Sequence, residues 1–321
     1  MVMPVHNRKE LLVPTLEALL EATRVHGSVE IILVDHASDA ATAAFLATHS
    51  SRATIVSLTS GHIAAARNFG ARHAHGTVLS FLDADCVVPQ DYFTTLEEVF
   101  AAFPAGAAGC EVGIPARPHW TERVWYEMHV VREDGYRHYL NSANFAVRRS
   151  VFDAIGGFDE ALVTGEDTDI CTRLRQHGET IYEAQRLSVV HLGNPKSLGA
   201  FYRKQVWHGL GAFGGALRSA RNKASMMVVA HGIATIAALA ILFVPSPLLL
   251  WHRIIASALL CLAVPAAAVL YRALETKRVT SPVLALTLYV AFFFARSQAL
   301  VTAWRRARMA VRRQVHARTA P

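Results

Sequence analysis

The sequence predicts an α/β fold in which a mainly parallel sheet carries helices on both faces, followed by C-terminal transmembrane or interfacial helices. Through residue 83, short apolar runs of the β type alternate with helical patterns, which is the rhythm of a parallel sheet. Two of these runs, 31–34 and 78–82, are almost continuously apolar, as strands buried on both faces are. The long apolar stretches all lie in the last third of the 321-residue chain, which is 52% hydrophobic.

The expected elements follow this rhythm in order. We expect strands at 1–5, 29–35, 53–58 and 77–83, and helices at 9–25, 39–48 and 62–74. Two later helices, 148–155 and 167–176, should end at Gly156-Gly157 and Gly178, because glycine after the last turn stops a helix. Between 104 and 141 the pattern weakens into Pro, Gly, Trp and Tyr, which indicates an insertion or loop.

Charge divides the chain near residue 195. Residues 1–195 contain 15 Lys and Arg against 24 Asp and Glu, whereas residues 196–321 contain 17 against the single Glu275. Basic residues among apolar spans indicate contact with membrane lipid, because an anionic surface attracts each Lys or Arg by roughly 1 kcal/mol. We expect no nucleic acid partner.

The four cysteines form no CxxC pair, which suits buried thiols in a reducing compartment.

These features predict four regions along the chain. They are a front domain at 1–210, a basic juxtamembrane linker at 211–225, two or three membrane helices within 226–303, and a basic tail at 304–321. The candidate spans, 226–244, 254–271 and 283–301, are close to the ~20 residues that cross the hydrocarbon core. The chain opens on Met-Val-Met-Pro-Val without a secretory signal, so we expect the front domain on the cytoplasmic side of the inner membrane.

The number of spans is open between two and three. Three spans would put the six arginines of 305–318 outside, against the positive-inside rule. Two spans with an interfacial or re-entrant third helix satisfy the rule, and we favour them. Arg296, within the third run, could instead pair inside a bundle of three spans.

Carboxylates follow two of the expected strands. Asp35 ends the strand at 29–35, and Asp83 and Asp85 follow the last strand with D-x-D spacing. Ligands of open α/β sheets bind beyond the carboxyl ends of the strands. Two convergent carboxylates suit a hard divalent cation, Mn²⁺ or Mg²⁺, that bridges a diphosphate. A solvated polar turn is the alternative for D-x-D taken by itself.

Six ordered motifs carry a resemblance to one family. They are MPVHNR, LVDHASD, AAARNFG, FLDADC, NFAVRRSVFDAIGGFDE and GEDTDICTRL. Over about residues 1–210 they resemble the inverting family 2 glycosyltransferases of the GT-A fold. The resemblance implies an enzyme that moves a sugar from a nucleotide-diphospho-sugar, with a UDP-sugar as the first candidate, in a metal-dependent reaction.

The resemblance also implies roles for individual residues. The positions that match nucleotide-sugar binding are Pro4, His6, Asn7, Asp35, Arg67, Asp83 and Asp85. Asp85 and His191 match the metal ligands. For His191 a satisfied histidine in a short buried strand is an equal alternative.

Asp167 matches the general base of the family. Asp167 and Asp169 point roughly 200° apart on an α-helix, so only one of them can face the acceptor. We choose Asp167. Helix capping at an N-terminus is the alternative for Glu166 and the favoured interpretation of Asp169.

The expected function is transfer of one sugar to a hydroxyl group of a membrane-associated glycolipid or a polyprenyl-linked glycan. Two alternatives stay open. A polyprenyl phosphate acceptor is already ionised and would need Asp167 less, and a non-catalytic scaffold would bind the nucleotide sugar without transfer. The three aspartates Asp83, Asp85 and Asp167 favour an enzyme over a scaffold.

Overall fold

The computed structural model describes residues 1–321 except 131–132, 215–222, 244, 246–248, 278–280 and 320–321. The chain forms two compact units: Met1–Arg117 with Val131–Asn194, and Pro118–Val130 with Pro195–Pro321. The expected boundary at residue 210 falls inside a helix of the second unit. Most of the expected linker at 211–225 lies outside the described residues, and its two described ends are helical.

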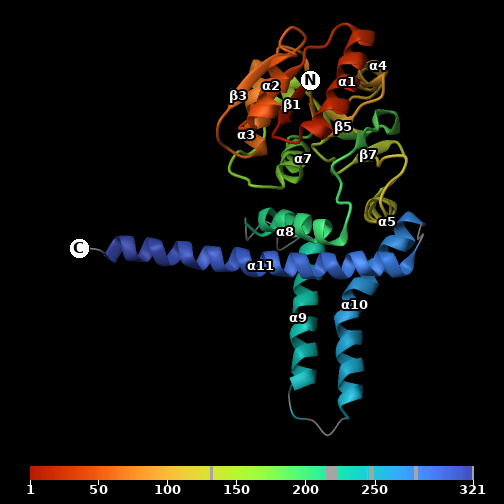
Figure 1. Ribbon diagram of the computed structural model, residues 1–321, viewed down its shortest axis with the longest axis vertical. Coiled ribbons are helices and arrows are strands. Elements are labelled where there is room, and N and C mark those ends of the chain that lie inside the picture. Colours follow the sequence, from red (N-terminus) through yellow and green to blue (C-terminus); the bar gives the residue numbers. More distant parts are fainter. Residues whose placement is uncertain (131–132, 215–222, 244, 246–248, 278–280, 320–321) are drawn as a thin grey trace. The chain divides into compact units, whose positions relative to one another are not determined.

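The first unit is an α/β fold, as the sequence predicts (Figure 1). Its eight-stranded sheet consists of β1 (Val2–Val5), β2 (Ile32–His36), β3 (Thr54–Leu58), β4 (Val78–Leu82), β6 (Ala107–Gly109), β7 (Gly135–Arg137), β8 (Asn144–Arg148) and β9 (Ile181–Glu183). The helices are α1 (Lys9–His26), α2 (Ala40–Ala47), α3 (Ile63–His73), α4 (Tyr92–Ala102), α6 (Arg149–Ala154) and α7 (Glu166–Gln176). A second, two-stranded sheet pairs β5 (Cys86–Val87) with β10 (Val190–His191).

The strand order β3-β2-β1-β4-β8-β6-β9-β7 makes the sheet mixed but mainly parallel. The first four strands in that order are parallel, and β8 runs antiparallel to both β4 and β6. The register places Val5 opposite Asp35, so the ends of β1 and β2 lie at one edge. Asp83 and Asp85 follow the end of β4, the next strand over.

Two apolar clusters form the core of this unit. Successive residues of β1 point to opposite faces, so Val2 belongs to one cluster and Met3 to the other. The Met3 cluster includes Leu12 and Leu16 of α1, and the Val2 cluster includes Ile170 of α7. Both faces are therefore covered by helices, which explains why β1, β2 and β4 read as continuous apolar runs.

Glycines end both later helices as expected. Gly156 and Gly157 after α6 have φ of 77° and 70°, and Gly178 after α7 has φ of 86°. These are left-handed conformations that glycine adopts without steric cost.

The segment 104–141 is not the loop that its composition indicates. It contains β6, β7 and the helix α5 (Trp120–His129), which belongs to the second unit. At the start of α5 the Glu122 carboxylate accepts the His119 backbone N–H at 2.8 Å. β6 is Ala-Ala-Gly and is fully buried, so it lacks the alternation and branched residues by which a strand is recognised.

The second unit is helical and consists of α5, α8 (Leu198–Gly214), α9 (Lys223–Phe243), α10 (Leu250–Thr276) and α11 (Pro282–Thr319). By length and composition, Ser225–Phe243, Leu250–Thr276 and Pro282–Arg305 could each cross a membrane. Residue 244, the expected end of the first span, lies outside the described residues. Within this unit α9 and α10 run side by side, and α11 lies across the pair with α8 beside it (Figure 1).

Candidate active site

A hydrogen-bonded turn joins the ends of β1 and β2. The Ser38 N–H donates to Oδ1 of Asp35 at 3.1 Å, and the Ser38 hydroxyl donates to the Val5 carbonyl at 3.2 Å. Asn7 closes the arrangement, because its Oδ1 accepts the Asp39 N–H at 2.6 Å. Asn7 and Asp35, two of the expected nucleotide-binding residues, are thus brought together at one edge of the sheet.

Two other expected nucleotide-binding residues are placed differently. Pro4 is buried within β1 opposite Val34, so it shapes the strand and does not line a surface. His6 is exposed, and its Nδ1 lies 2.7 Å from the His36 carbonyl. The following Asn7 and Arg8 both have left-handed φ, 57° and 58°. Such conformations cost free energy for non-glycine residues and often occur at binding sites.

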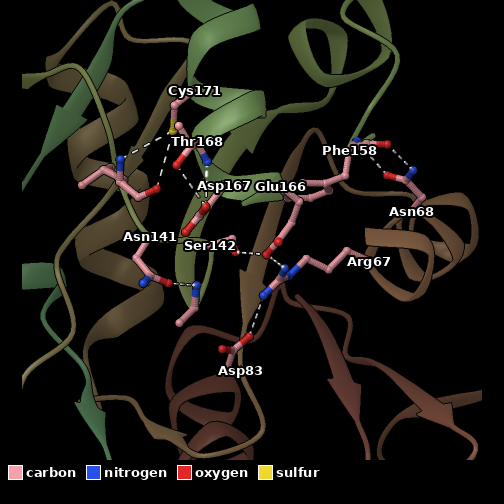
Figure 2. Close-up of polar contacts among 12 residues, drawn as sticks. Arg67, Asn68, Asp83, Asn141, Ser142, Phe158, Glu166, Asp167, Thr168 and Cys171 are labelled. Atoms are coloured by element: carbon pink, nitrogen blue, oxygen red, sulfur yellow. Dashed lines mark hydrogen bonds and ion pairs between the residues drawn. The ribbon is translucent and has the colours of Figure 1, made fainter. Parts of the chain in front are cut away.

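The Arg67 side chain occupies the centre of the site in Figure 2. It extends from α3 and is 2% exposed. Its Nη2 donates to Asp83 Oδ1 and its Nη1 donates to Glu166 Oε1, both at 2.7 Å. Burial lowers the pKa of Arg67, but the two carboxylates outweigh burial and raise it above its ordinary value, so the guanidinium stays charged. Ser142 adds a hydrogen bond to Glu166 at 3.1 Å.

Asp167 follows Glu166 in the first turn of α7. The Thr168 N–H donates to Asp167 Oδ1 at 2.7 Å, and the Tyr139 hydroxyl donates to Oδ2 at 2.6 Å. Burial and the neighbouring Glu166 raise the pKa of Asp167, while these two hydrogen bonds oppose the rise. Asp169 instead pairs with Arg173 one turn later on α7 at 2.6 Å.

Asp85 and His191 meet beside the two-stranded sheet. His191 Nε2 lies 3.2 Å from Asp85 Oδ1, and one ligand atom of each of Asp85, Cys86 and His191 lies within 4.8 Å of the others. Arg8 approaches the other carboxylate oxygen of Asp85, with its Nη1 at 3.7 Å from Oδ2. The buried Nδ1 of His191 has no hydrogen-bond partner among the described residues. The His191 imidazole thus meets a carboxylate through Nε2 and leaves Nδ1 unsatisfied, which is uncommon for a buried polar atom.

Space beside Asp85 depends on a glycine. A Cβ added to Gly193 would collide with Oδ2 of Asp85 and lie 3.2 Å from Arg8 Nη1. The chain after β10 therefore passes so close to the Asp85 carboxylate that a side chain at position 193 would force this carboxylate to shift.

Comparisons with known proteins identify the family and the fold. Residues 1–156 match the model of the family described as glycosyl transferase family 2. The first 156 residues are therefore part of a family 2 glycosyltransferase domain. Glycosyltransferase AglE of Haloferax volcanii is 23% identical over 218 residues, which cover 65% of this chain and 71% of AglE. The O-antigen biosynthesis protein RfbC of Myxococcus xanthus is 26% identical over 241 residues, covering 66% of this chain and 19% of RfbC.

The fold of the glycosyltransferase also has a solved counterpart. The mannosyltransferase PcManGT of Pyrobaculum calidifontis, solved with GDP-Man and Mn²⁺, matches with a TM-score of 0.58 at 21% identity. The match covers 94% of this chain and 86% of PcManGT. The GT-A fold expected from the six motifs is confirmed.

Several residues of this glycosyltransferase site did not stand out in the sequence. Helix capping was only the alternative considered for Glu166, and in the structure its carboxylate pairs with Arg67. Tyr139, Arg8 and Gly193 stand outside the six motifs or at their edges, and each reaches the site through a contact with Asp167 or Asp85. The adjacent acids Glu166 and Asp167 in GEDTD were the available signal. Helix capping does not account for two neighbouring carboxylates at one helix start, so a cationic partner for Glu166 could have been expected.

Proposed function

We propose that this glycosyltransferase moves a sugar from a nucleoside-diphosphate sugar to a hydroxyl group of a membrane-associated glycolipid or polyprenyl-linked acceptor, with metal assistance and inversion at the anomeric carbon. The supporting observation is the ion-pair chain of Arg67. It joins Asp83, at the end of β4, to Glu166, the residue before Asp167. The ion pairs of Arg67 thus link Asp83, on the expected donor side, to the helix start that carries the expected base, Asp167.

Nucleotide binding would involve the turn that joins β1 and β2. Asn7 and Asp35 present polar groups beyond the carboxyl ends of these strands, the usual ligand position in open α/β sheets. His6 is exposed beside them, whereas Pro4 would act only by shaping β1. UDP-sugars remain our first candidates, and the GDP-Man bound by PcManGT makes GDP-sugars the second.

A divalent metal would be held by Asp85 and His191. A carboxylate oxygen with an imidazole nitrogen fits Mn²⁺ better than Mg²⁺, which prefers oxygen ligands throughout. Mn²⁺ is also the ion in the PcManGT complex. When bound, the metal acts as a Lewis acid that stabilises negative charge on the departing diphosphate.

Asp167 would accept the proton of the acceptor hydroxyl. The acceptor oxygen then forms a bond to the anomeric carbon as the bond from that carbon to the diphosphate oxygen breaks. The raised pKa of Asp167 makes it a stronger base than an ordinary aspartate, and a positioned base contributes about 10²–10⁴-fold to the rate. A single displacement of this kind inverts the configuration.

A donor screen tests the proposal. The purified full chain in detergent is incubated with UDP-, GDP- and dTDP-sugars plus a membrane lipid extract, and nucleoside diphosphate release is measured with Mn²⁺, Mg²⁺ or chelator. We expect release from one donor, lost with chelator and in Asp85→Ala. Absence of release from every donor would instead support a nucleotide-sugar-binding scaffold.

The Asp167→Asn variant separates the two acceptor classes. With a hydroxyl acceptor its turnover should fall by about 10²-fold or more, since the proton has no acceptor. Near-normal turnover would favour a polyprenyl phosphate acceptor, whose oxygen is already ionised.

For the membrane unit we propose two spans, α9 and α10, with α11 along the membrane surface on the cytoplasmic side. Polar residues in the middle of α11 are held by α8: Arg296 Nη2 donates to Gln205 at 3.1 Å, and Tyr202 donates to Gln298 at 2.7 Å. α8 carries Arg203 and Lys204, which are costly inside hydrocarbon. The helix beside it therefore belongs at the interface, as the two-span alternative requires.

Single cysteines test this topology in a background without native thiols. A membrane-impermeant maleimide added outside intact cells should label Leu249→Cys, between α9 and α10, but neither Ser281→Cys nor Trp304→Cys. Labelling of Trp304→Cys from outside would show that α11 crosses the membrane.

A further inference from the structure

The segment from Tyr139 to Ser142 runs along the start of α7. Ser142 donates to Glu166, and the Leu140 backbone exchanges two contacts with the Cys171 thiol, both at 3.5 Å. Asp167 and Cys171 stand one turn apart, so they share a face of α7, as Figure 2 shows. Leu140 is fully buried. The backbone that carries Tyr139 is thus fixed against the helix that carries Asp167.

This anchoring directs the Tyr139 hydroxyl to the carboxylate of Asp167. The bond to Oδ2 is 2.6 Å long, while Oδ1 is occupied by the Thr168 N–H at 2.7 Å. Two donors on opposite oxygens prevent rotation of the carboxylate about its Cβ–Cγ bond. Each carboxylate oxygen accepts two hydrogen bonds, so Oδ2 can still receive an acceptor hydroxyl while Tyr139 remains in place. Tyr139 itself is 37% exposed and is accessible beside this oxygen.

We propose that Tyr139 is a positioning residue of this active site, whose phenol O–H orients the Asp167 carboxylate toward the acceptor hydroxyl and keeps it ionised. The proposal rests on the role of Asp167 as the base. A hydrogen bond to a charged acceptor is stronger than one to a neutral group, and it favours the ionised carboxylate. Partial burial of the phenol and the Asp167 carboxylate raise the pKa of Tyr139 well above its ordinary value, so the phenol keeps its proton near neutral pH.

Other ionisable groups surround Asp167. In any pH experiment, their effect on the pH profile must be distinguished from the effect of Tyr139. They are Glu166 and Cys171 on α7, Arg67 on α3, and Glu111 after β6. Glu111 is the principal concern, because burial, Glu183 and Asp167 raise its pKa to about 7. The measurements are therefore made both in the natural chain and in a Glu111→Gln background.

The test compares Tyr139→Phe with Tyr136→Phe in the full chain. Tyr136 is a matched control, since it is exposed in the neighbouring strand β7 and its ring packs on Tyr182. For Tyr139→Phe we expect kcat to fall about 10-fold with an unchanged donor KM, because hydrogen bonds to charged groups contribute about this much. The acidic limb of the kcat/KM profile should move up by roughly one to two pH units. Tyr136→Phe should match the natural chain.

If Tyr139 had only a structural role, Tyr139→Phe would lower activity equally at every pH. A kcat/KM profile of Tyr139→Phe that keeps the acidic limb of the natural chain therefore overturns the proposal. Folding is checked by the thermal midpoint and by nucleoside diphosphate affinity. Replacement of Tyr139 by 3-fluorotyrosine provides a second variant of nearly the same shape. Its more acidic phenol is a stronger donor, so the acidic limb should move down, and an unchanged limb contradicts the inference.

The Asp167→Asn variant separates this inference from the proposed function. If Asp167→Asn retains near-normal turnover, the base assignment fails and the role of Tyr139 fails with it. If Asp167→Asn is inactive while the Tyr139 variants keep the natural pH profile, the proposed function stands and only the positioning role is overturned.

Discussion

Nε2 of His191 and Oδ1 of Asp85 lie 3.2 Å apart, although Asp85 precedes β5 and His191 stands in β10. The pairing of these two short strands, with His191 opposite Cys86, produces the approach. The pairing in the second sheet therefore brings these two candidate ligands together.

Loss of the imidazole should weaken metal binding. His191→Ala is expected to reduce Mn²⁺ affinity in the presence of nucleoside diphosphate by at least about 10-fold, since even residues that only support a ligand cost 10–100-fold when removed. Isothermal titration of Mn²⁺ checks this. His177→Ala, which removes an exposed histidine after α7, is the control. Equal affinity in both variants would contradict the ligand role.

Gly193→Ala should disturb the same candidate metal site by a steric effect alone. The new methyl group would displace the Asp85 carboxylate, so Mn²⁺-dependent turnover should fall by roughly 10-fold or more while the fold is retained. Turnover against Mn²⁺ concentration is the measurement. Gly199→Ala is the control, because its Cβ would meet only Arg203 Nη1 at 3.6 Å. Natural turnover in Gly193→Ala would show that Asp85 can move without loss.

Removal of the Arg67 charge should destabilise the domain. Arg67→Met leaves the buried Glu166 carboxylate without its counter-charge, which typically costs about 3–5 kcal/mol. Chemical unfolding of the full chain in detergent measures the change. Arg72→Met on the same helix removes an exposed pair and should cost at most about 1 kcal/mol. Adding Glu166→Gln to Arg67→Met should restore part of the loss, and no restoration would contradict the pairing.

Glu111 should make stability depend on pH near neutrality. The pKa of Glu111 rises from its ordinary value of 4.5 to about 7 in the folded chain, so between these two pH values the folded state binds a proton that the unfolded state does not. Stability therefore falls as pH rises through this window, by up to about 3 kcal/mol, and does not recover above it. Glu111→Gln should flatten the curve of unfolding free energy between pH 5 and roughly 8 and stabilise the protein at the upper end. A curve parallel to that of the natural chain would contradict this.

Sequence periodicity was sufficient for the parallel half of the sheet and for the carboxylates at its edge. Asp35, Asp83 and Asp85 could be placed because each stands at the end of a recognisable buried strand or just after it. β6 and α5 could not be predicted in the same way, since β6 has three small residues and α5 stands in an aromatic, proline-containing segment.

The ion pairs of the candidate site could not be predicted from local sequence patterns. Arg67 was expected near the nucleotide, but both of its terminal nitrogens are engaged by carboxylates. Its partner Glu166 is 99 residues away along the chain. Such contacts depend on how α3 and α7 are brought together, which no periodicity within either helix records.

The packing of α5 has a consequence for the order of synthesis. Trp125 of α5 stacks edge-on against Phe201 of α8 and lies beside Phe292 of α11, and Tyr289 of α11 contacts His129. A growing chain produces α5 long before these partners. The apolar face of α5 must therefore remain without its final contacts until the last helix has left the ribosome. Nascent chains that end before α11 are thus expected to bind chaperones or to aggregate.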